Sequence, residues 1–184
     1  EVAVTTKGKV KENDQTFKTL ASPMDLEIPV AVLIDNRSAS ASEIVSGVIQ
    51  DFDRGVIIGQ RSFGKGLVQN TKPVGYNSIL KLTTSKYYIP SGRCIQGVEY
   101  ENGQPKDIPD NQRSKFKTKN GRTVYDGGGI SPDVIMEETK TSTIAEALEK
   151  NDAIFNYVTN YYYKNPNLGD KIPTIADSDL ADFK

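Results

Sequence analysis

The chain has 184 residues, and with roughly 150 residues in a typical domain this length predicts one principal domain. Lys and Arg number 23 against 24 Asp and Glu, so the net charge of -1 lacks the basic excess that nucleic-acid partners require. Cys94 is the only cysteine and there is no histidine, which excludes an internal disulfide, a zinc site built on cysteine clusters or imidazole, and a Ser-His-Asp or Cys-His apparatus within this chain.

The first residues are typical of a strand and not of a targeting segment. Residues 2–6 read Val-Ala-Val-Thr-Thr, and residues 1–10 lack the basic and apolar halves of a signal peptide. No stretch approaches the roughly 18 apolar residues of a membrane helix. Because the chain starts at Glu1 without a methionine and enters strand sequence at once, we expect a fragment that is incomplete at its N-terminus.

Residues 29–59 predict a strand, a helix and a second strand. The run at 29–35 is continuously apolar and ends in a polar turn, as in a strand buried on both faces of a parallel sheet. The residues 56–59 form a second short apolar run, and a crossover helix between two strands implies parallel pairing. Helical spacing begins near Ser40 and places one apolar stripe on the helix, made of Ala41, Ile44, Val45, Val48, Ile49 and Phe52.

Further strands and a long polar segment follow. Residues 67–69 and 79–89 are rich in β-branched and tyrosine residues and predict strands of the same or an adjoining sheet, with a turn at 75–77. Residues 99–129 are polar and rich in glycine, and end in three glycines, which favours a long surface loop or hairpin.

Near the C-terminus the pattern predicts one more helix. Apolar residues recur at helical spacing from Ile144 to Tyr162, with Ser142 or Thr143 as the cap and Asn165-Pro166 as the stop. We therefore expect a core over residues 1–165 and a C-terminal tail over 166–184.

Ser40 lies where the first buried strand turns into a helix, which is where ligands and catalytic groups gather in open α/β sheets. Helix N-terminal N–H groups lack intrahelical partners and can donate to an oxyanion, so the Ala41 N–H is a candidate oxyanion-hole donor for a Ser40 nucleophile. Ser38, Ser40 and Ser42 could also serve simply as helix caps, and the residues alone leave the catalytic and the capping interpretation open.

Lys65 lies between two glycines and is the candidate general base. An amine accepts a proton only when it is neutral, and burial favours the neutral form. Gly64, Gly66 and the apolar neighbours Phe63 and Leu67 would suit a pocket of that kind, and Gln69 could orient the amine without adding a negative charge. A solvated turn lysine and a polar strand glutamine remain the alternatives.

Five short motifs occur in order along the chain. They are Ser38-Ala39-Ser40-Ala41-Ser42-Glu43, Gln50-Asp51-Phe52, Phe63-Gly64-Lys65-Gly66 with Gln69, Lys86-Tyr87-Tyr88-Ile89-Pro90-Ser91-Gly92-Arg93 with Ile95-Gln96-Gly97, and Gly129-Ile130-Ser131-Pro132-Asp133. Together they resemble the carboxyl-terminal processing proteases of peptidase family S41, also called tail-specific proteases, over about residues 1–135.

The resemblance implies a serine endopeptidase of the Ser-Lys type that cleaves proteins near their C-termini without a metal or cofactor. Ser40 would be the nucleophile, Lys65 the base and Gln69 the residue that steadies the lysine, while Asp51 would have a supporting role. It also implies an α/β fold of the ClpP/crotonase type, with a mixed, mostly parallel sheet and flanking helices. The implied surroundings are an upstream PDZ domain that captures substrate C-termini and an extracytoplasmic location in bacteria.

Two departures from the family pattern stand out. The upstream segment with paired glycines that helps to complete the oxyanion hole is not visible, and Cys94 stands where a small residue such as serine is usual. One alternative function is a non-catalytic or truncated module of the same fold that binds peptide without cutting it. Another, a crotonase-like acyl-CoA enzyme, would need an acid pair or oxyanion glycines that we do not find.

Overall fold

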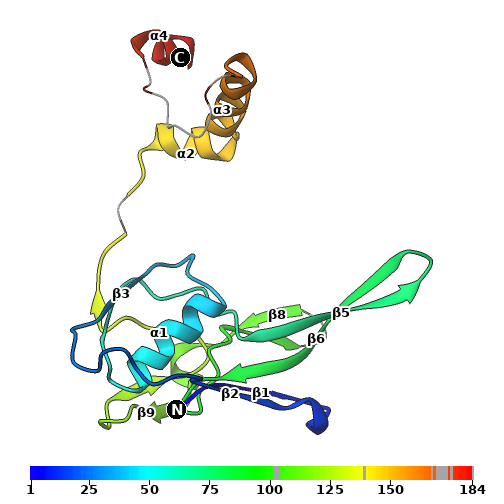
Figure 1. Cartoon of the computed structure of the whole chain (residues 1–184), viewed down its shortest axis with the longest axis vertical. Helices are drawn as coiled ribbons and strands as arrows, with labels where there is room; N and C mark the ends of the chain where they lie inside the picture. The colour runs from blue at the N-terminus through cyan, green and yellow to red at the C-terminus, as the bar shows by residue number, and fades with distance from the viewer. Residues whose placement is uncertain (102–103, 139, 167, 169–173, 175, 184) are drawn as a thin grey trace. The chain divides into compact units, whose positions relative to one another are not determined.

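The structure is a computed structural model that describes residues 1–101, 104–138, 140–166, 168, 174 and 176–183. The chain divides into two compact units, Glu1–Glu138 and Thr139–Lys184, and each is described by itself. The larger unit holds the strands and helix α1, and the smaller unit holds helices α2 to α4 (Figure 1). This division falls earlier than the boundary expected near residue 165, and the assignment of 1–165 to a catalytic core stays a prediction.

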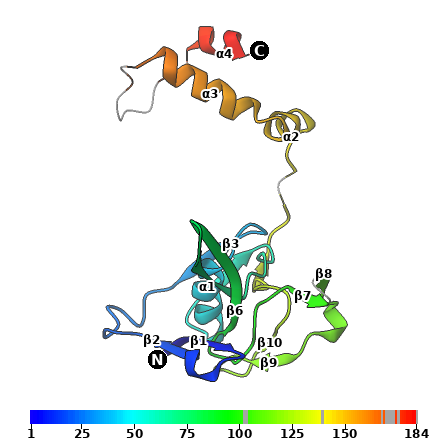
Figure 2. The ribbon, with the colours of Figure 1, turned by 90° about the vertical axis from the view of Figure 1, so that its right-hand side faces the viewer.

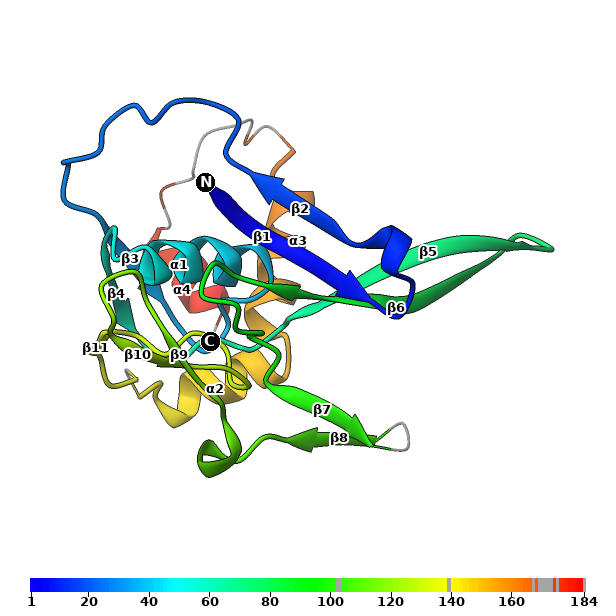
Figure 3. The same ribbon diagram turned by 90° about the horizontal axis from the view of Figure 1, so that it is seen from below.

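An antiparallel sheet forms one part of the larger unit. Its strand order is β2-β1-β6-β5, with β1 at Val2–Gly8, β2 at Gln15–Lys18, β5 at Leu67–Gly75 and β6 at Ser78–Tyr88. Strands β5 and β6 make a long hairpin that extends away from α1 (Figure 3). Tyr76 and Asn77 have φ of 50° and 54°, as a two-residue type I′ turn requires. The turn predicted at 75–77 is confirmed.

The predicted strand-helix-strand unit is also confirmed. Strand β3 (Ala31–Ile34), helix α1 (Ala41–Asp51) and strand β4 (Val56–Gly59) follow one another, β3 and β4 pair in parallel, and β11 (Val134–Ile135) adds a parallel strand on the other side of β4. The mixed α/β class holds. Among the described residues only these three strands pair in parallel and the larger sheet is antiparallel, so the expectation of a mostly parallel sheet is wrong. The expected burial of β3 on both faces is wrong, because Ile34 is 6% exposed whereas Leu33 is 76% exposed.

Helix α1 buries most deeply a face beside the predicted apolar stripe, of which Ile44 and Ile49 pack against the core while partly buried. Its buried residues are Glu43, Ser46, Gly47, Gln50 and Asp51, while Val45 of the stripe is exposed. Polar side chains tolerate burial only when hydrogen bonds satisfy them, and the loops packed against this face supply the partners. Periodicity therefore located the helix but only part of the side that it turns inward.

The segment from 98 to 125 is a series of short hairpins. Strands β7 (Val98–Glu101) and β8 (Gln104–Asp107) pair antiparallel, and after the short 3-10 turn η2 (Asp110–Gln112), β9 (Lys115–Lys117) pairs with β10 (Thr123–Tyr125). Another 3-10 turn, η1 (Lys11–Asn13), joins β1 to β2. The loop or hairpin expected over residues 99–129 is thus a hairpin-rich segment.

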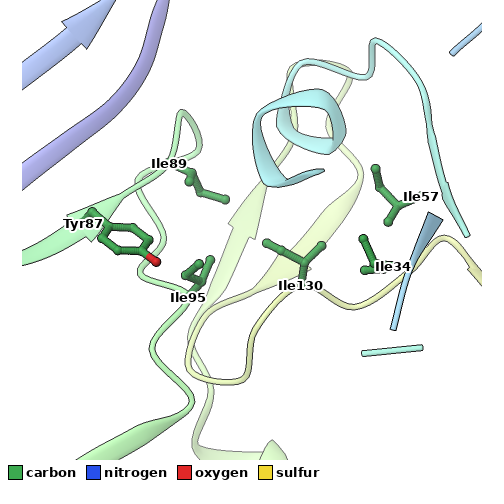
Figure 4. Close-up of a cluster of buried hydrophobic side chains, with 6 residues drawn as sticks. All are labelled: Ile34, Ile57, Tyr87, Ile89, Ile95 and Ile130. Atoms are coloured by element: carbon green, nitrogen blue, oxygen red, sulfur yellow. The ribbon is translucent and has the colours of Figure 1, made fainter. Parts of the chain in front are cut away.

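The hydrophobic core lies between α1 and the strands and loops beneath it. Figure 4 shows its buried members, which are Ile34, Ile57, Tyr87, Ile89, Ile95 and Ile130. Gly47 lets α1 approach them closely, since a Cβ at this position would lie 2.6 Å from Cδ1 of Ile89. The core thus couples α1 to the end of β6.

A buried ion pair holds the C-terminal end of α1. Nη2 of Arg93, a residue only 1% exposed, lies 2.9 Å from Oδ1 of Asp51 and donates to Oε1 of Gln50 at 2.8 Å. Burial lowers the pKa of Arg93, and the neighbouring carboxylate of Asp51 opposes this shift. Asp51 also accepts the Ser91 N–H at 2.9 Å. This contact ties α1 to the segment after β6.

Asp133 makes a second tie to the same helix end. Its carboxylate accepts the Ile57 N–H at 2.9 Å, Nε2 of Gln50 at 2.9 Å and Nη1 of Arg122 at 2.6 Å. Burial opposes ionisation, but these hydrogen bonds outweigh it and lower the pKa of Asp133. The Gly-Ile-Ser-Pro-Asp motif therefore joins β4 to α1.

The smaller unit contains α2 (Thr143–Lys150), α3 (Ala153–Lys164) and α4 (Asp177–Phe183). Ser142 caps α2 by accepting the Ala145 N–H at 3.3 Å, as predicted. The single helix expected here is wrong: it breaks at Asp152, whose φ of 51° interrupts the helical backbone. The expected tail carries α4, which lies beside α3 in Figure 2, with the rings of Tyr157 and Phe183 4.9 Å apart. Among the described residues, no helix is both long and apolar enough to cross a membrane.

Breaking the Asp51–Arg93 pair from either side should destabilise the larger unit. Asp51→Asn or Arg93→Met leaves the remaining polar group buried without its partner, and each should lower the free energy of unfolding by about 3–5 kcal/mol. The double variant should lose less than the sum of the two. Urea unfolding followed by far-UV circular dichroism measures these values, with Arg61→Met, at an exposed pair with Asp110, as the control. Losses that simply add would contradict direct coupling of the two residues.

Candidate active site

Ser40 has an unusual backbone conformation at the start of α1. Its φ of 59° and ψ of -116° lie in a region that glycine occupies far more readily, and such a conformation costs about 1–3 kcal/mol. Strained residues of this kind cluster at functional sites. The side chain is half-buried, so it is supported by neighbours while remaining partly accessible.

A single buried carboxylate supports this conformation. Glu43 is fully buried, and its Oε2 accepts the N–H groups of Ser40 and Lys65, each at 2.8 Å. Its Oε1 accepts the Gly64 N–H at 2.6 Å and the Ser62 hydroxyl at 2.5 Å. One side chain thus positions the backbones of Ser40 and Lys65 together. The sequence analysis gave Glu43 no role; the only signal was a glutamate three residues after a helix-cap serine.

Close backbone contacts hold the Lys65 segment on its other side. Gly64 has φ of 89°, and a Cβ there would lie 2.9 Å from the backbone of Gly97. The Gly97 N–H donates to the Gly64 carbonyl at 2.8 Å, and the Gly66 N–H donates to Oε1 of Gln96 at 2.7 Å. Only glycine permits so close an approach in this conformation. The glycines therefore serve to dock the segment.

The Lys65 side chain is exposed, which corrects the expectation of a buried amine. The flanking residues Gly64 and Gly66 have no side chains to cover it, and Phe63 points outward and is 65% exposed. The glycines thus allow tight docking of the backbone but provide no apolar enclosure for the amine.

The predicted residues nevertheless meet at one cavity. A hollow of about 440 Å³, here called the serine cavity, is lined by Ser40, Lys65 and Gln69 together with Val4, Thr6, Phe17, Ile44, Leu67, Val68, Lys81 and Tyr87. Ala41 is the first residue of α1, and its N–H has no intrahelical partner. Asp51 lies at the other end of α1, about 16 Å away at 1.5 Å per residue, and supports the fold through Arg93.

Tyr87 is a second residue that the sequence analysis left without a role. It is 4% exposed, and its hydroxyl donates to the Lys65 carbonyl and interacts with the Ser40 hydroxyl. Burial raises the pKa of Tyr87 to about 12, although the Ser40 hydroxyl opposes the shift. The phenol is therefore neutral near physiological pH and acts as a hydrogen-bond donor. Its signal in sequence was the tyrosine pair at the end of the predicted strand 79–89.

A second, larger hollow adjoins the serine cavity. It has a volume of about 900 Å³ and is here called the side cleft; its lining residues are Asn36, Arg37, Ala39, Phe63, Gly64, Lys65, Leu67, Gln69, Gln96 and Val98. Lys65, Leu67 and Gln69 line both hollows. In the parts of the chain that the structure describes, no group of three or more His, Cys, Asp or Glu could hold a metal ion.

The four donors on Glu43 generate a prediction about stability. Glu43→Gln keeps the shape but replaces one acceptor oxygen by an NH₂ group that faces N–H donors, so it should lower the free energy of unfolding by roughly 3 kcal/mol. Chemical denaturation of the two proteins in parallel measures the difference. Glu27→Gln, at an exposed loop position, is the matched control, and an equally small effect of both changes would contradict the assigned geometry.

Comparison with known proteins places this chain in a family. Residues 1–109 match peptidase family S41, and residues 144–184 match the family described as "Probable PDZ-protease, C-terminal helical domain", which covers nearly all of α2 and the whole of α3 and α4. A carboxy-terminal-processing protease of Bartonella bacilliformis is 48% identical over 95 residues, covering 52% of this chain and 22% of that protein.

Two other similar proteins are also described as proteases of this kind. A "Probable CtpA-like serine protease" of Staphylococcus epidermidis is 37% identical over 50% of this chain and 18% of its own length. The solved photosystem II D1 C-terminal processing protease matches with a TM-score of 0.52 and 25% identity, over 74% of this chain and 27% of that one. The chain thus spans about a fifth of the length of the curated relatives it matches. It belongs to peptidase family S41, the serine peptidases that include the carboxy-terminal-processing proteases.

Proposed function

We propose that this chain supplies the nucleophile and base of a serine endopeptidase that cleaves protein substrates near their C-termini. The observation that carries the proposal is the meeting of Ser40, Lys65 and Gln69 at the serine cavity, with Ser40 strained at a helix N-terminus. Family membership supports the reaction class, and the names of the relatives support the C-terminal preference.

In the proposed reaction, the neutral Lys65 amine takes the proton of the Ser40 hydroxyl as Oγ attacks a peptide carbonyl. The Ala41 N–H donates to the oxyanion, where the positive end of α1 favours negative charge. Collapse of the tetrahedral intermediate releases the C-terminal piece as an amine protonated by Lys65. Water then hydrolyses the acyl-enzyme with the same lysine as base, which frees the new carboxylate and restores Ser40.

The exposed Lys65 side chain sets a condition on this mechanism. A charged amine in water does not accept a proton, so the substrate must exclude water from the serine cavity before Lys65 can act. Gln69 lines the same cavity, and in the proposed mechanism its side-chain carbonyl accepts a hydrogen bond from the amine. The exposure also favours the second candidate function, a non-catalytic module that binds peptide at this cavity.

The surroundings of the site form part of the proposal. We place an upstream PDZ domain that captures substrate C-termini beside this catalytic unit, in line with the helical family matched at residues 144–184. An extracytoplasmic location in bacteria rests on the resemblance of the motifs, and fractionation of cells that express the complete protein tests it.

Ser40→Ala should abolish peptide hydrolysis while changing the thermal midpoint little. Loss of a helix cap costs only about 0.5–2 kcal/mol, whereas loss of a nucleophile lowers the rate by several orders of magnitude. The test uses turnover of a fluorogenic peptide by the complete protein that carries these residues, with labelling by a fluorophosphonate and peptide mapping. Ser42→Ala, at an exposed serine, is the control. Peptide binding with neither labelling of Ser40 nor turnover would favour the binding module, and full turnover by Ser40→Ala would exclude this nucleophile.

Lys65→Arg should be as inactive as Lys65→Ala. Arginine keeps the positive charge and much of the reach but does not deprotonate in proteins, so it separates a base from an electrostatic clamp. The comparison is of kcat for the two variants with the same peptide, with Lys72→Arg in the exposed hairpin as the control. Substantial activity in Lys65→Arg would mean that another group is the base.

A further inference from the structure

The side cleft is placed to receive substrate residues beyond those at Ser40. It shares Lys65, Leu67 and Gln69 with the serine cavity, and Ala39 in its wall immediately precedes Ser40. A peptide bound for attack by Ser40 therefore extends into the side cleft in at least one direction. The chemistry of the cleft lining then selects among substrates.

The lining of the side cleft carries positive but no negative side chains. Apart from Lys65 its only charged residue is Arg37, and it contains no aspartate or glutamate. The amide of Gln96 is already used, since Oε1 accepts the Gly66 N–H and Nε2 donates to the Val98 carbonyl. Arg37 is therefore the charged group of the side cleft that the proposed reaction at Ser40 leaves unused.

A hydrogen-bonded turn positions the backbone of Arg37. Oδ1 of Asp35 accepts the N–H groups of Arg37 and Ser38 at 3.0 and 2.8 Å, and the Phe63 N–H donates to the Ser38 carbonyl at 2.9 Å. The Asp35 carboxylate is the nearest acid along the chain, and its Oδ1 also accepts the Ser38 hydroxyl at 2.9 Å. In the part of the chain that the structure describes, no carboxylate lies within ion-pair distance of the Arg37 guanidinium.

Part of the cleft lining is apolar. Phe63 exposes 65% of its surface, and Leu67 and Val98 are half-buried beside it. An arginine next to exposed apolar surface suits a carboxylate carried on an otherwise apolar peptide, because guanidinium pairs with carboxylate through two parallel hydrogen bonds.

We propose that Arg37 is a specificity residue that binds a carboxylate of the substrate peptide in the side cleft. This inference rests on the proposed function, since it describes the substrate of the same site. The carboxylate comes either from the free C-terminus of the substrate or from an aspartate or glutamate side chain near the cleaved bond.

The test compares two matched pairs of peptides. The two peptides of the first pair differ only in having a free or an amidated C-terminus. Both peptides of the second pair are amidated, and they differ only in having glutamate or glutamine at one position near the cleaved bond. For each pair, the ratio of kcat/KM with and without the carboxylate is measured in wild type, Arg37→Gln and Arg37→Lys. Arg61→Gln is the control, because it removes the same charge at an exposed arginine outside the cleft lining.

We expect Arg37→Gln to reduce the carboxylate preference roughly tenfold, the effect of one charge-assisted contact, and Arg37→Lys to retain part of it. Arg61→Gln should leave the ratio unchanged, and added salt should weaken the wild-type preference. A loss confined to the first pair assigns the terminal carboxylate, and a loss confined to the second assigns an acidic side chain. An unchanged ratio in Arg37→Gln would overturn the inference, as would an equal loss for all four peptides.

Measurements of peptide binding distinguish a failure of this inference from a failure of the proposed function. If the wild type cleaves none of the peptides, the dissociation constants of fluorescently labelled forms of the same four peptides are measured by anisotropy. A carboxylate preference that Arg37→Gln removes would support Arg37 as a recognition residue of a binding module. Equal affinities for the paired peptides would overturn it independently of catalysis.

Discussion

The buried carboxylate of Glu43 is the interaction on which the candidate site depends. It accepts four hydrogen bonds, from Ser40, Ser62, Gly64 and Lys65, and so joins the first turn of α1 to a segment about twenty residues later in the chain. A buried charge is stable only when donors surround it, so this carboxylate specifies a particular arrangement of two loops. The strained backbone of Ser40 persists because this arrangement over-determines it.

Helix α1 is held at both ends by buried polar groups. Glu43 secures its N-terminal end, whereas Asp51 and Gln50 secure the other end through Arg93 and Asp133. Between these ends the helix packs on the core through Gly47. The direction of α1, and hence the aim of its N–H groups at the serine cavity, is therefore set by charges at two separate places. This fits a helix whose function requires a fixed orientation.

Local patterns in the sequence predicted local structure well. The strand-helix-strand unit, the turn at Tyr76–Asn77 and the Ser142 cap of α2 follow from apolar runs, periodicity and turn and capping chemistry, all of which act over a few residues. The break at Asp152 was missed because apolar spacing continues across it while one backbone angle does not. The exposure of Leu33 was missed because an apolar run does not reveal what covers each face.

The residues of the candidate site were likewise predicted only where the signal was local. Motif spacing led to Ser40, Lys65 and Gln69, which do line one cavity. It could not reveal the roles of Glu43 and Tyr87, since these depend on contacts between distant segments, and glutamate on a helix is ordinarily a solvated residue. Nor could it foresee the exposed Lys65 side chain, which depends on which way Phe63 turns.

The backbone of Ser40 has an evolutionary consequence. Glycine adopts this conformation without strain and is nearly as good as serine at a helix start, so selection for folding alone would favour glycine at position 40. Serine at this position lowers the stability of the fold relative to glycine, so a function of the hydroxyl explains its presence. Drift toward glycine at this position would therefore be a sign, in any descendant of this chain, that the chemistry had been given up while the fold was kept.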